Sequence, residues 1–389
     1  MDISEKLIYL DNAATSQIPD EVLRDILSQL QYNFGNPNAK YKVGSFANDF
    51  LETSRHVVAS RIGALSNEIY FTSGATESNN WAFYSVLNQQ ENVPSVITSA
   101  IEHESVLEPL KHLEREGKIK LKIIDVDGKG RLLVHDYLKA FDSSTVLVSI
   151  MYANNEIGTI QDIELLSQIA HSHGALFHCD AVQAVGHEYF DLHILNNIDY
   201  LSASAHKFHG PKGIGFLYVK EGCPLNPLLY GGGQEMKMRS GTQNVPYIVA
   251  MAEALEWSLY KKEHYEELFE AWQNYLIDTL CSEISGCMLT GSSSHRLNHL
   301  CSFVIDGVDT EMLLMLLDQD GICVSAGSAC SSGSLEISHV LKAIGLDDSV
   351  SRGALRISYS YLNTFEEIKY AAQKIIDAVK RCRIFTGDF

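Results

Sequence analysis

The chain has 389 residues, of which 46% are hydrophobic, and its 30 basic against 49 acidic residues give a formal net charge of −19. This length favours two domains or one large and one small lobe, and the apolar content argues against disorder. The negative charge argues against direct binding to nucleic acid or to an anionic membrane surface.

The N-terminal residues Met1 to Glu5 lack the basic stretch and apolar run of a signal peptide, and no apolar run approaches membrane-spanning length. The eight cysteines include no CxxC pair, so neither a zinc cluster nor a disulfide framework is supported. We therefore predict a cytoplasmic protein with reduced thiols, no membrane association and no resident metal.

From residue 69 onward, after one strand and two helices, strands and helices are predicted to alternate. The strands are predicted at 7–10, 69–73, 95–100, 119–125, 145–151, 175–179, 200–205 and 215–219. The helices are predicted at 19–32, 44–62, 74–89, from 102 onward, at 134–141 and at 162–174. Such alternation predicts a mostly parallel sheet that is covered by helices on both faces.

The pattern changes at the Gly-rich polar segment 231–244, which we predict to be mobile or to face a ligand. A long helix over about 246–280 is predicted to join the two lobes. The remaining predicted elements are a strand at 299–305, a helix capped by Asp309, a Gly/Ser-rich loop at 325–334, a helix at about 335–344, a strand at 354–360 and a helix opened by the capping box of Thr364 and Glu367.

The strand at 200–205 runs directly into Ser204, His206 and Lys207. A lysine at the tip of a buried strand is costly to keep charged, and burial lowers its pKa, so its free amine can attack a carbonyl. A Schiff base with pyridoxal phosphate is one role for such a lysine, and a surface lysine after a strand is the other. This segment alone does not choose between them.

Other polar residues also fall where predicted strands end, and ligands of parallel sheets bind beyond those ends. The turn at 74–76 could hold a phosphate or be an ordinary helix start. Asp180 could pair with a pyridine nitrogen or cap a helix, and His103 could stack on a cofactor ring and move protons or be a boundary histidine. Arg356 could clamp a substrate carboxylate or form a structural salt bridge.

Cys330 lies within the Gly/Ser-rich loop at 325–334. The small residues around it allow the loop to swing and leave the sulfur accessible. A nucleophilic cysteine needs that access and a stabilised thiolate. Chance inclusion of a cysteine in a flexible linker is the alternative.

Together these segments resemble the cysteine desulfurases of the NifS/IscS class, within the class V aminotransferase family of fold type I pyridoxal-phosphate enzymes. The match runs from Tyr9 to about residue 380, and its markers are Thr72–Ser78, Glu102–His103, Asn154–Gly158, Asp180–Gln183, Ser204–Lys207, Arg239–Thr242 and Gly327–Cys330. The resemblance implies an α/β fold with a large domain at 16–255, built on a mostly parallel seven-stranded sheet. It also implies a smaller α+β domain, formed by 1–15 and 256–389, that carries the Cys330 loop.

The resemblance implies pyridoxal 5'-phosphate as the cofactor, with Lys207, Cys330 and His103 as catalytic residues. Lys207 would bind the aldehyde, Asp180 would face the pyridine nitrogen and Gln183 the ring hydroxyl. The other cofactor contacts would come from Ala75, Thr76, His103, Asn155, Ser204 and His206, and from Thr242 of the partner subunit in a homodimer. Asn155 and Arg356 would hold the substrate carboxylate.

The implied reaction converts L-cysteine to L-alanine, and the sulfur passes to Cys330 as a persulfide and then to an acceptor protein for iron–sulfur cluster assembly or tRNA thiolation. The small residues after Cys330 resemble the long-loop group, and the short end of the chain after its last predicted helix makes a tRNA-thiolation enzyme an acceptor comparable to an iron–sulfur scaffold. A transient contact of Cys330 with an iron–sulfur cluster is a further role that the sequence leaves undecided. The alternatives are a selenocysteine lyase or aminotransferase on the same fold, or an interaction protein that kept the fold without its chemistry.

Overall fold

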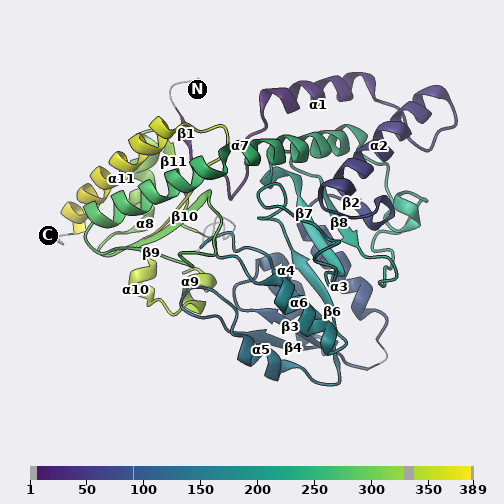
Figure 1. Cartoon of the computed structure of the whole chain (residues 1–389), viewed down its shortest axis with the longest axis horizontal. Helices are drawn as coiled ribbons and strands as arrows, with labels where there is room; N and C mark the ends of the chain where they lie inside the picture. Colours follow the sequence, from purple (N-terminus) through teal and green to yellow (C-terminus); the bar gives the residue numbers. More distant parts are fainter. Residues whose placement is uncertain (1–6, 91, 328–336, 387–389) are drawn as a thin grey trace.

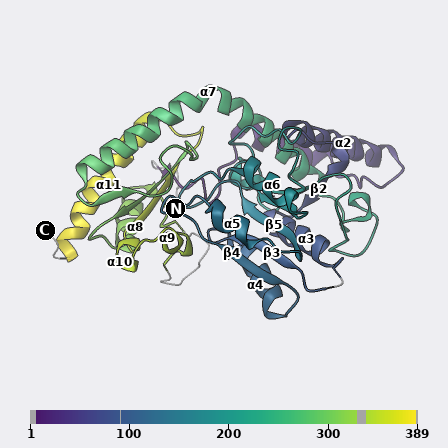
Figure 2. The ribbon, with the colours of Figure 1, turned by 60° about the horizontal axis from the view of Figure 1, so that its bottom comes forward.

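The computed structural model describes residues 7–90, 92–327 and 337–386 of the chain. Within these ranges the chain forms two main sheets with helices packed around them, and one long helix runs along both (Figures 1 and 2). No helix in the described ranges is both long and apolar enough to span a bilayer.

The larger sheet has seven strands in the order β2-β8-β7-β6-β5-β3-β4. Its strands are β2 (Ile69–Thr72), β3 (Ser95–Ser99), β4 (Lys120–Ile124), β5 (Thr145–Met151), β6 (Leu176–Asp180), β7 (Tyr200–Ser204) and β8 (Gly215–Val219). All neighbours pair in parallel except β8, which is antiparallel to both β2 and β7. The segment 205–214 between β7 and β8 is too short for a helical crossover, so β8 returns antiparallel. The predicted mostly parallel sheet is confirmed.

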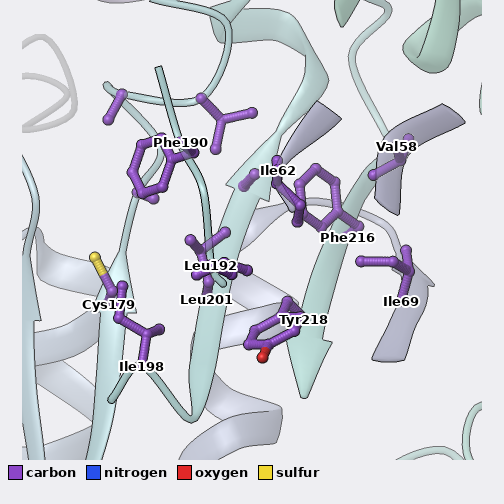
Figure 3. Close-up of a cluster of buried hydrophobic side chains, with 14 of the residues drawn as sticks. Val58, Ile62, Ile69, Cys179, Phe190, Leu192, Ile198, Leu201, Phe216 and Tyr218 are labelled. Carbon is purple, nitrogen blue, oxygen red and sulfur yellow. The ribbon is translucent and has the colours of Figure 1, made fainter. Parts of the chain in front are cut away.

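Helices cover both faces of this sheet, because successive strand residues point to opposite sides. The helices are α2 (Lys42–Arg61), α3 (Ala75–Leu87), α4 (Glu104–Arg115), α5 (Val134–Ala140), α6 (Ile163–Ser172) and α7 (Val245–Glu283). Leu201 and Phe216 are buried in a core with α2, α5, α6 and α7, while their neighbours Tyr200 and Leu217 are buried in another with α3 and α4. Figure 3 shows part of the first core, where side chains from α2, β2, β7 and β8 gather.

Helix α7 has 39 residues and connects the two parts of the molecule (Figure 2). Its first half contributes Val249 and Leu255 to the core of the large sheet, and its second half contributes Phe269 and Leu276 to the other core. The side chain of Asn244 caps its start by accepting a hydrogen bond from the backbone N–H of Tyr247. Helix α1 (Asp20–Tyr32) packs beside α7 on the large-sheet side.

The second part of the molecule is an α+β arrangement. Its antiparallel sheet has the order β12-β10-β9, and a short parallel pair, β1-β11, lies beside it. The strands are β1 (Ile8–Tyr9), β9 (Cys287–Leu289), β10 (Leu300–Ile305), β11 (Ile322–Cys323) and β12 (Ala354–Ser358), and the helices are α8 (Thr310–Gln319), α9 (His339–Ala343), α10 (Asp348–Ser351) and α11 (Phe365–Thr386). The predicted α/β fold class is confirmed, while the exact domain boundaries at 16–255 and at 1–15 with 256–389 stay a prediction.

Several elements of this second part differ from the prediction. The sequence did not indicate β9, β11 or α10, which are too short to show a periodic pattern. The helix predicted from about 335 begins instead at His339, because the hydroxyl of Ser338 caps it by accepting from the backbone N–H groups of Val340 and Leu341. Most of the predicted loop at 325–334, including Cys330, lies outside the described residues.

Candidate active site

A cavity of about 460 Å³ opens at the carboxyl edge of the large sheet. It brings together nine of the predicted site residues: Ala75, Thr76, His103, Asn155, Asp180, Gln183, Ser204, His206 and Lys207. They follow β2, β3, β5, β6 and β7, and they meet because the carboxyl ends of these strands, which run in the same direction, share one edge of the sheet. Their individual roles stay predictions.

Lys207 ends the 3-10 turn Ala205–Lys207 that follows β7. Its Nζ donates to the carbonyl oxygens of Ala13 at 2.7 Å and Ala14 at 2.9 Å. Its own carbonyl oxygen accepts from Nε2 of the buried His187 at 2.8 Å. Two backbone carbonyl groups therefore help to anchor the amine at the cavity.

Asp180 is the last residue of β6 and is 5% exposed. Its Oδ1 accepts from the backbone N–H of Val182 at 3.1 Å, and its Oδ2 accepts from Nδ2 of Asn79 at 3.0 Å. Gln183 lies one turn further on, and its Nε2 donates to the carbonyl oxygen of Ala13 at 3.0 Å. These bonds hold a carboxylate and an amide at the floor of the cavity.

The part of the cavity lining at the start of α3 is suited to an anion. Helix α3 begins at Ala75 directly after Gly74, whose φ of 150° is a backbone conformation that side chains rarely adopt. Unpaired amides at a helix start and nearby hydroxyls bind phosphate well. Burial, together with the positive charges of Lys207 and Lys212, lowers the pKa of His206 to about 4, so this imidazole is neutral near pH 7.

Thr15 and Lys212 also line the cavity, and the sequence analysis missed both. The oxygen Oγ1 of Thr15 lies 3.2 Å from Nδ1 of His206, a contact between residues 191 positions apart. Lys212 follows Lys207 in a Gly- and Pro-containing turn, and a second lysine so close to a predicted phosphate site was the signal available. Its cation adds to the anion-binding character of this part of the lining.

The donor set fits pyridoxal phosphate. Lys207 supplies an amine for the aldehyde, and Asp180 supplies a carboxylate for a protonated ring nitrogen. The segment 74–76 and Lys212 supply a cationic, hydroxyl-lined helix start for the phosphate. Among the residues that the structure describes, no group of three or more His, Cys, Asp or Glu is arranged to hold a metal ion.

Glu102 directly precedes the cavity-lining His103 and is fully buried. Its Oε1 accepts from the hydroxyl of Ser99 at 2.5 Å and from the backbone N–H of Met151 at 3.0 Å. Burial, with a smaller contribution from the charge of Asp180, raises the pKa of this carboxyl group to about 8. Glu102 is thus predominantly protonated at neutral pH.

Two predicted residues lie away from the cavity. Thr242 is exposed and lines a separate hollow of about 120 Å³. Arg356 is 1% exposed: its Nη2 lies 2.7 Å from Oδ1 of Asp11, and its Nη1 donates to the carbonyl oxygens of Asn155 at 2.9 Å and Gly327 at 2.7 Å. These contacts are those of a structural salt bridge, the alternative role given for Arg356. The binding of a substrate carboxylate by Arg356 stays a prediction.

Cys330 lies outside the described residues, but residues on both sides of it in the sequence are linked by hydrogen bonds to the region of Asn155 and Glu156. The carbonyl oxygen of Gly327 is bound by Arg356, and the hydroxyl of Ser338 donates to Oε2 of Glu156 at 2.5 Å. Glu156 directly follows Asn155, which lines the cavity. Gly327 and Ser338, which lie on either side of the Cys330 segment in the sequence, therefore both contact the side chains or backbone around Asn155 and Glu156.

Residues 8–371 match the model of the family described as aminotransferase class-V. The chain belongs to this family. One of its relatives, the cysteine desulfurase IscS of Methanosarcina thermophila, is 40% identical to this chain. The match covers 97% of this chain and 93% of the relative's length.

Solved structures agree with the family assignment. A NifS-like protein is 38% identical, with a TM-score of 0.91 over 97% of this chain and all of its own. The structure of SspA in complex with cysteine is 32% identical, with a TM-score of 0.79 over 92% of this chain and all of its own. The predicted resemblance to cysteine desulfurases of the NifS/IscS class is confirmed by these relatives.

Proposed function

We propose that this family member is a pyridoxal-phosphate-dependent cysteine desulfurase that converts L-cysteine to L-alanine and passes the sulfur to Cys330. The observation that carries the proposal is the meeting of Lys207, Asp180 and the phosphate-type helix start in one cavity. The names of the relatives, and the cysteine in the SspA complex, support the choice of substrate.

When bound, pyridoxal phosphate supplies an electron sink that makes the Cα proton of a bound amino acid acidic. Lys207 would hold the aldehyde and, once displaced by the substrate amine, would move the Cα proton. Asp180 would keep the ring nitrogen protonated, and Gln183 would bind the ring hydroxyl. His103 would stack on the ring, and Asn155 would orient the substrate.

The phosphate would be held by the start of α3 at Ala75 and Thr76, with Ser204 and His206. Lys212, which lines the same cavity, would add a positive charge. A phosphate anchor at the start of α3, together with Lys207, would hold the reacting carbon atoms in a fixed position.

The sulfur transfer would take place on Cys330. Its thiolate would form a bond to the substrate sulfur while the Cβ–S bond of the substrate breaks. The electron pair of that bond would stay with the substrate carbon, which takes up a proton and becomes the methyl group of alanine. A persulfide on Cys330 would then pass its outer sulfur to an acceptor protein, either an iron–sulfur scaffold or a tRNA-thiolation enzyme, in the cytoplasm.

A homodimer is part of the proposal. Large apolar side chains are exposed on α1, on the segment that follows it and near the start of α2, among them Leu27, Leu30, Tyr32, Phe34 and Phe46. Exposed apolar side chains in such number are a common feature of protein interfaces. In the dimer, Thr242 would reach the phosphate site of the partner subunit.

The segment that carries Thr242 is held firmly, which suits a contribution in trans. Glu235 is buried and forms a bidentate pair with Arg55, with N–O distances of 2.8 and 2.9 Å. Three successive residues, Glu235, Met236 and Lys237, have positive φ values of 45°, 55° and 71°. Backbone in this region is strained and persists only where the surroundings hold it, as the buried ion pair does here.

The direct test incubates the purified protein with L-cysteine and a reductant and measures sulfide and alanine together. Equal amounts of both, and a yellow cofactor absorbance band, are expected. Cys330→Ser should keep that absorbance but lose persulfide and multiple-turnover alanine, while Cys281→Ser, at an exposed cysteine, is the matched control. A keto acid in place of alanine would favour the aminotransferase, and an unaffected Cys330→Ser variant would refute the role of Cys330.

A further inference from the structure

A continuous chain of hydrogen bonds links Asp180 to His103 through two side chains with no role assigned above. Nδ2 of Asn79 donates to Oδ2 of Asp180 at 3.0 Å and to Oγ of Ser105 at 2.9 Å. Oγ of Ser105 in turn lies 2.8 Å from Nδ1 of His103. Asn79 is fully buried, and Ser105 lines the cavity together with His103 and Asp180.

The direction of every bond in this chain follows from Asp180. An ionised carboxylate only accepts hydrogen bonds, so the amide of Asn79 must turn its NH₂ group toward it, because the opposite orientation would place two oxygens against each other. The second N–H of the same group then points at Ser105 Oγ. The amide oxygen of Asn79 is buried and has no hydrogen-bond partner, so nothing in the described structure favours the reverse orientation.

The hydroxyl of Ser105 accepts from Asn79 and therefore has its own hydrogen to donate, and Nδ1 of His103 is within reach. The backbone N–H of Ser105 also donates to this Nδ1, at 3.1 Å, and a backbone N–H can only donate. Two donors thus face one ring nitrogen. Nδ1 carries no proton in this arrangement, and the proton of the neutral imidazole resides on Nε2.

We propose that Asn79 and Ser105 are positioning residues that set the tautomer of His103, so that His103 presents Nε2 as a proton donor in the reaction. The proposal deepens the function proposed above, since it depends on His103 acting in that site. Neither residue touches the reacting atoms in this assignment. The carboxylate of Asp180 orients the proton of His103 through them.

The test is made on the holoenzyme labelled with ¹⁵N-histidine, in which the resonances of His103 are identified by their loss in His103→Gln. The wild type is expected to show Nδ1 as the unprotonated nitrogen and Nε2 as the protonated one. Ser105→Ala removes the hydroxyl donor but keeps the backbone N–H donor, so the share of the Nδ1-protonated tautomer should rise above that of the wild type. Ser105→Thr, which keeps both donors, should restore the wild-type pattern. Asn80→Ala is the matched control, because Asn80 is the next residue of α3 and bonds only within that helix, to the carbonyl oxygen of Thr76.

Turnover gives a second readout. Loss of one hydrogen bond predicts a fall in kcat of about 3- to 10-fold for Ser105→Ala with little change in KM. A protonated Nδ1 in the wild type, or a Ser105→Ala variant with the wild-type tautomer, would overturn the proposal. If Ser105→Ala does not fold, the wild-type spectrum alone decides. If L-cysteine is not desulfurated but the spectra behave as expected, the proposed function fails and the tautomer assignment stands.

Discussion

Two regions of the molecule hold their polar side chains in different environments. On the large-sheet side, Lys207, Asp180 and His103 end or follow strands and line an open cavity. On the side of β12, Arg356 is engaged by Asp11, Asn155 and Gly327, and is almost wholly shielded from solvent.

This difference distinguishes the polar groups that can react from those that hold the chain in position. Polar groups that line a cavity keep the capacity to bind and react, whereas buried groups paired with one another fix the chain in place. Arg356 and Glu156 hold the residues that flank the Cys330 segment, through Gly327 and Ser338. Changes on the first side should therefore reduce activity in a stable protein, and changes on the second side should reduce stability.

The largest effect is expected for Lys207→Ala. Removal of the amine should lower kcat by about 10⁴-fold or more, since both covalent attachment of the cofactor and movement of the Cα proton would be lost. The measurement is alanine formation, together with mass spectrometry after borohydride reduction. Lys212→Ala, at the other lysine of the cavity, should keep the covalently fixed cofactor. A fixed cofactor in Lys207→Ala would show that another residue binds the aldehyde.

The next effect tests the opposite side. Arg356→Ala should lower the free energy of unfolding by about 3 kcal/mol, because a buried pair loses one partner and the carbonyl oxygens of Asn155 and Gly327 lose a donor. Urea unfolding measures this, with the exposed Arg352→Ala as control. An unchanged stability with a raised KM for L-cysteine would contradict a structural role for Arg356 and would favour the predicted binding of the substrate carboxylate.

The smallest effect concerns Glu102, which is fully buried but is next in sequence to the cavity-lining His103. Its pKa is raised from 4.5 to about 8, so the folded protein holds a proton that the unfolded chain releases above about pH 4.5. Its stabilising contribution is full below that pH and is lost as the pH rises through 8, at up to about 1.4 kcal/mol per pH unit. Glu102→Gln keeps the acceptor oxygen and should remove this loss.

Urea-unfolding midpoints of the wild type and Glu102→Gln at pH 6, 7 and 8 test the last prediction. The variant should gain stability relative to the wild type as the pH rises. Glu104→Gln, at the exposed neighbour on α4, should follow the wild type. Parallel curves for all three proteins would mean that Glu102 is ionised in the folded state.

Much of the large-sheet side could be predicted because its signals are local. A strand that runs into Lys207, a strand that ends at Asp180 and a turn that opens α3 are each readable over a few residues, and the parallel sheet rule places them at one edge. Thr15 was missed because its place in the cavity depends on how distant segments pack, whereas the position of Lys212 close after Lys207 was a local signal. The helix predicted from about 335 was wrong in its start, since the cap at Ser338 decided it.

The sequence alone therefore determined the α/β class and the ordered motifs of the family, and it predicted which residues carry the chemistry. The tertiary structure decided what those residues contact. The pair of Arg356 and Asp11 joins residues 345 positions apart, and the bond of Asn79 to Asp180 spans 101 positions. Periodicity and turn chemistry act over a few residues, whereas such contacts depend on the order of the strands and on how the two parts of the molecule pack.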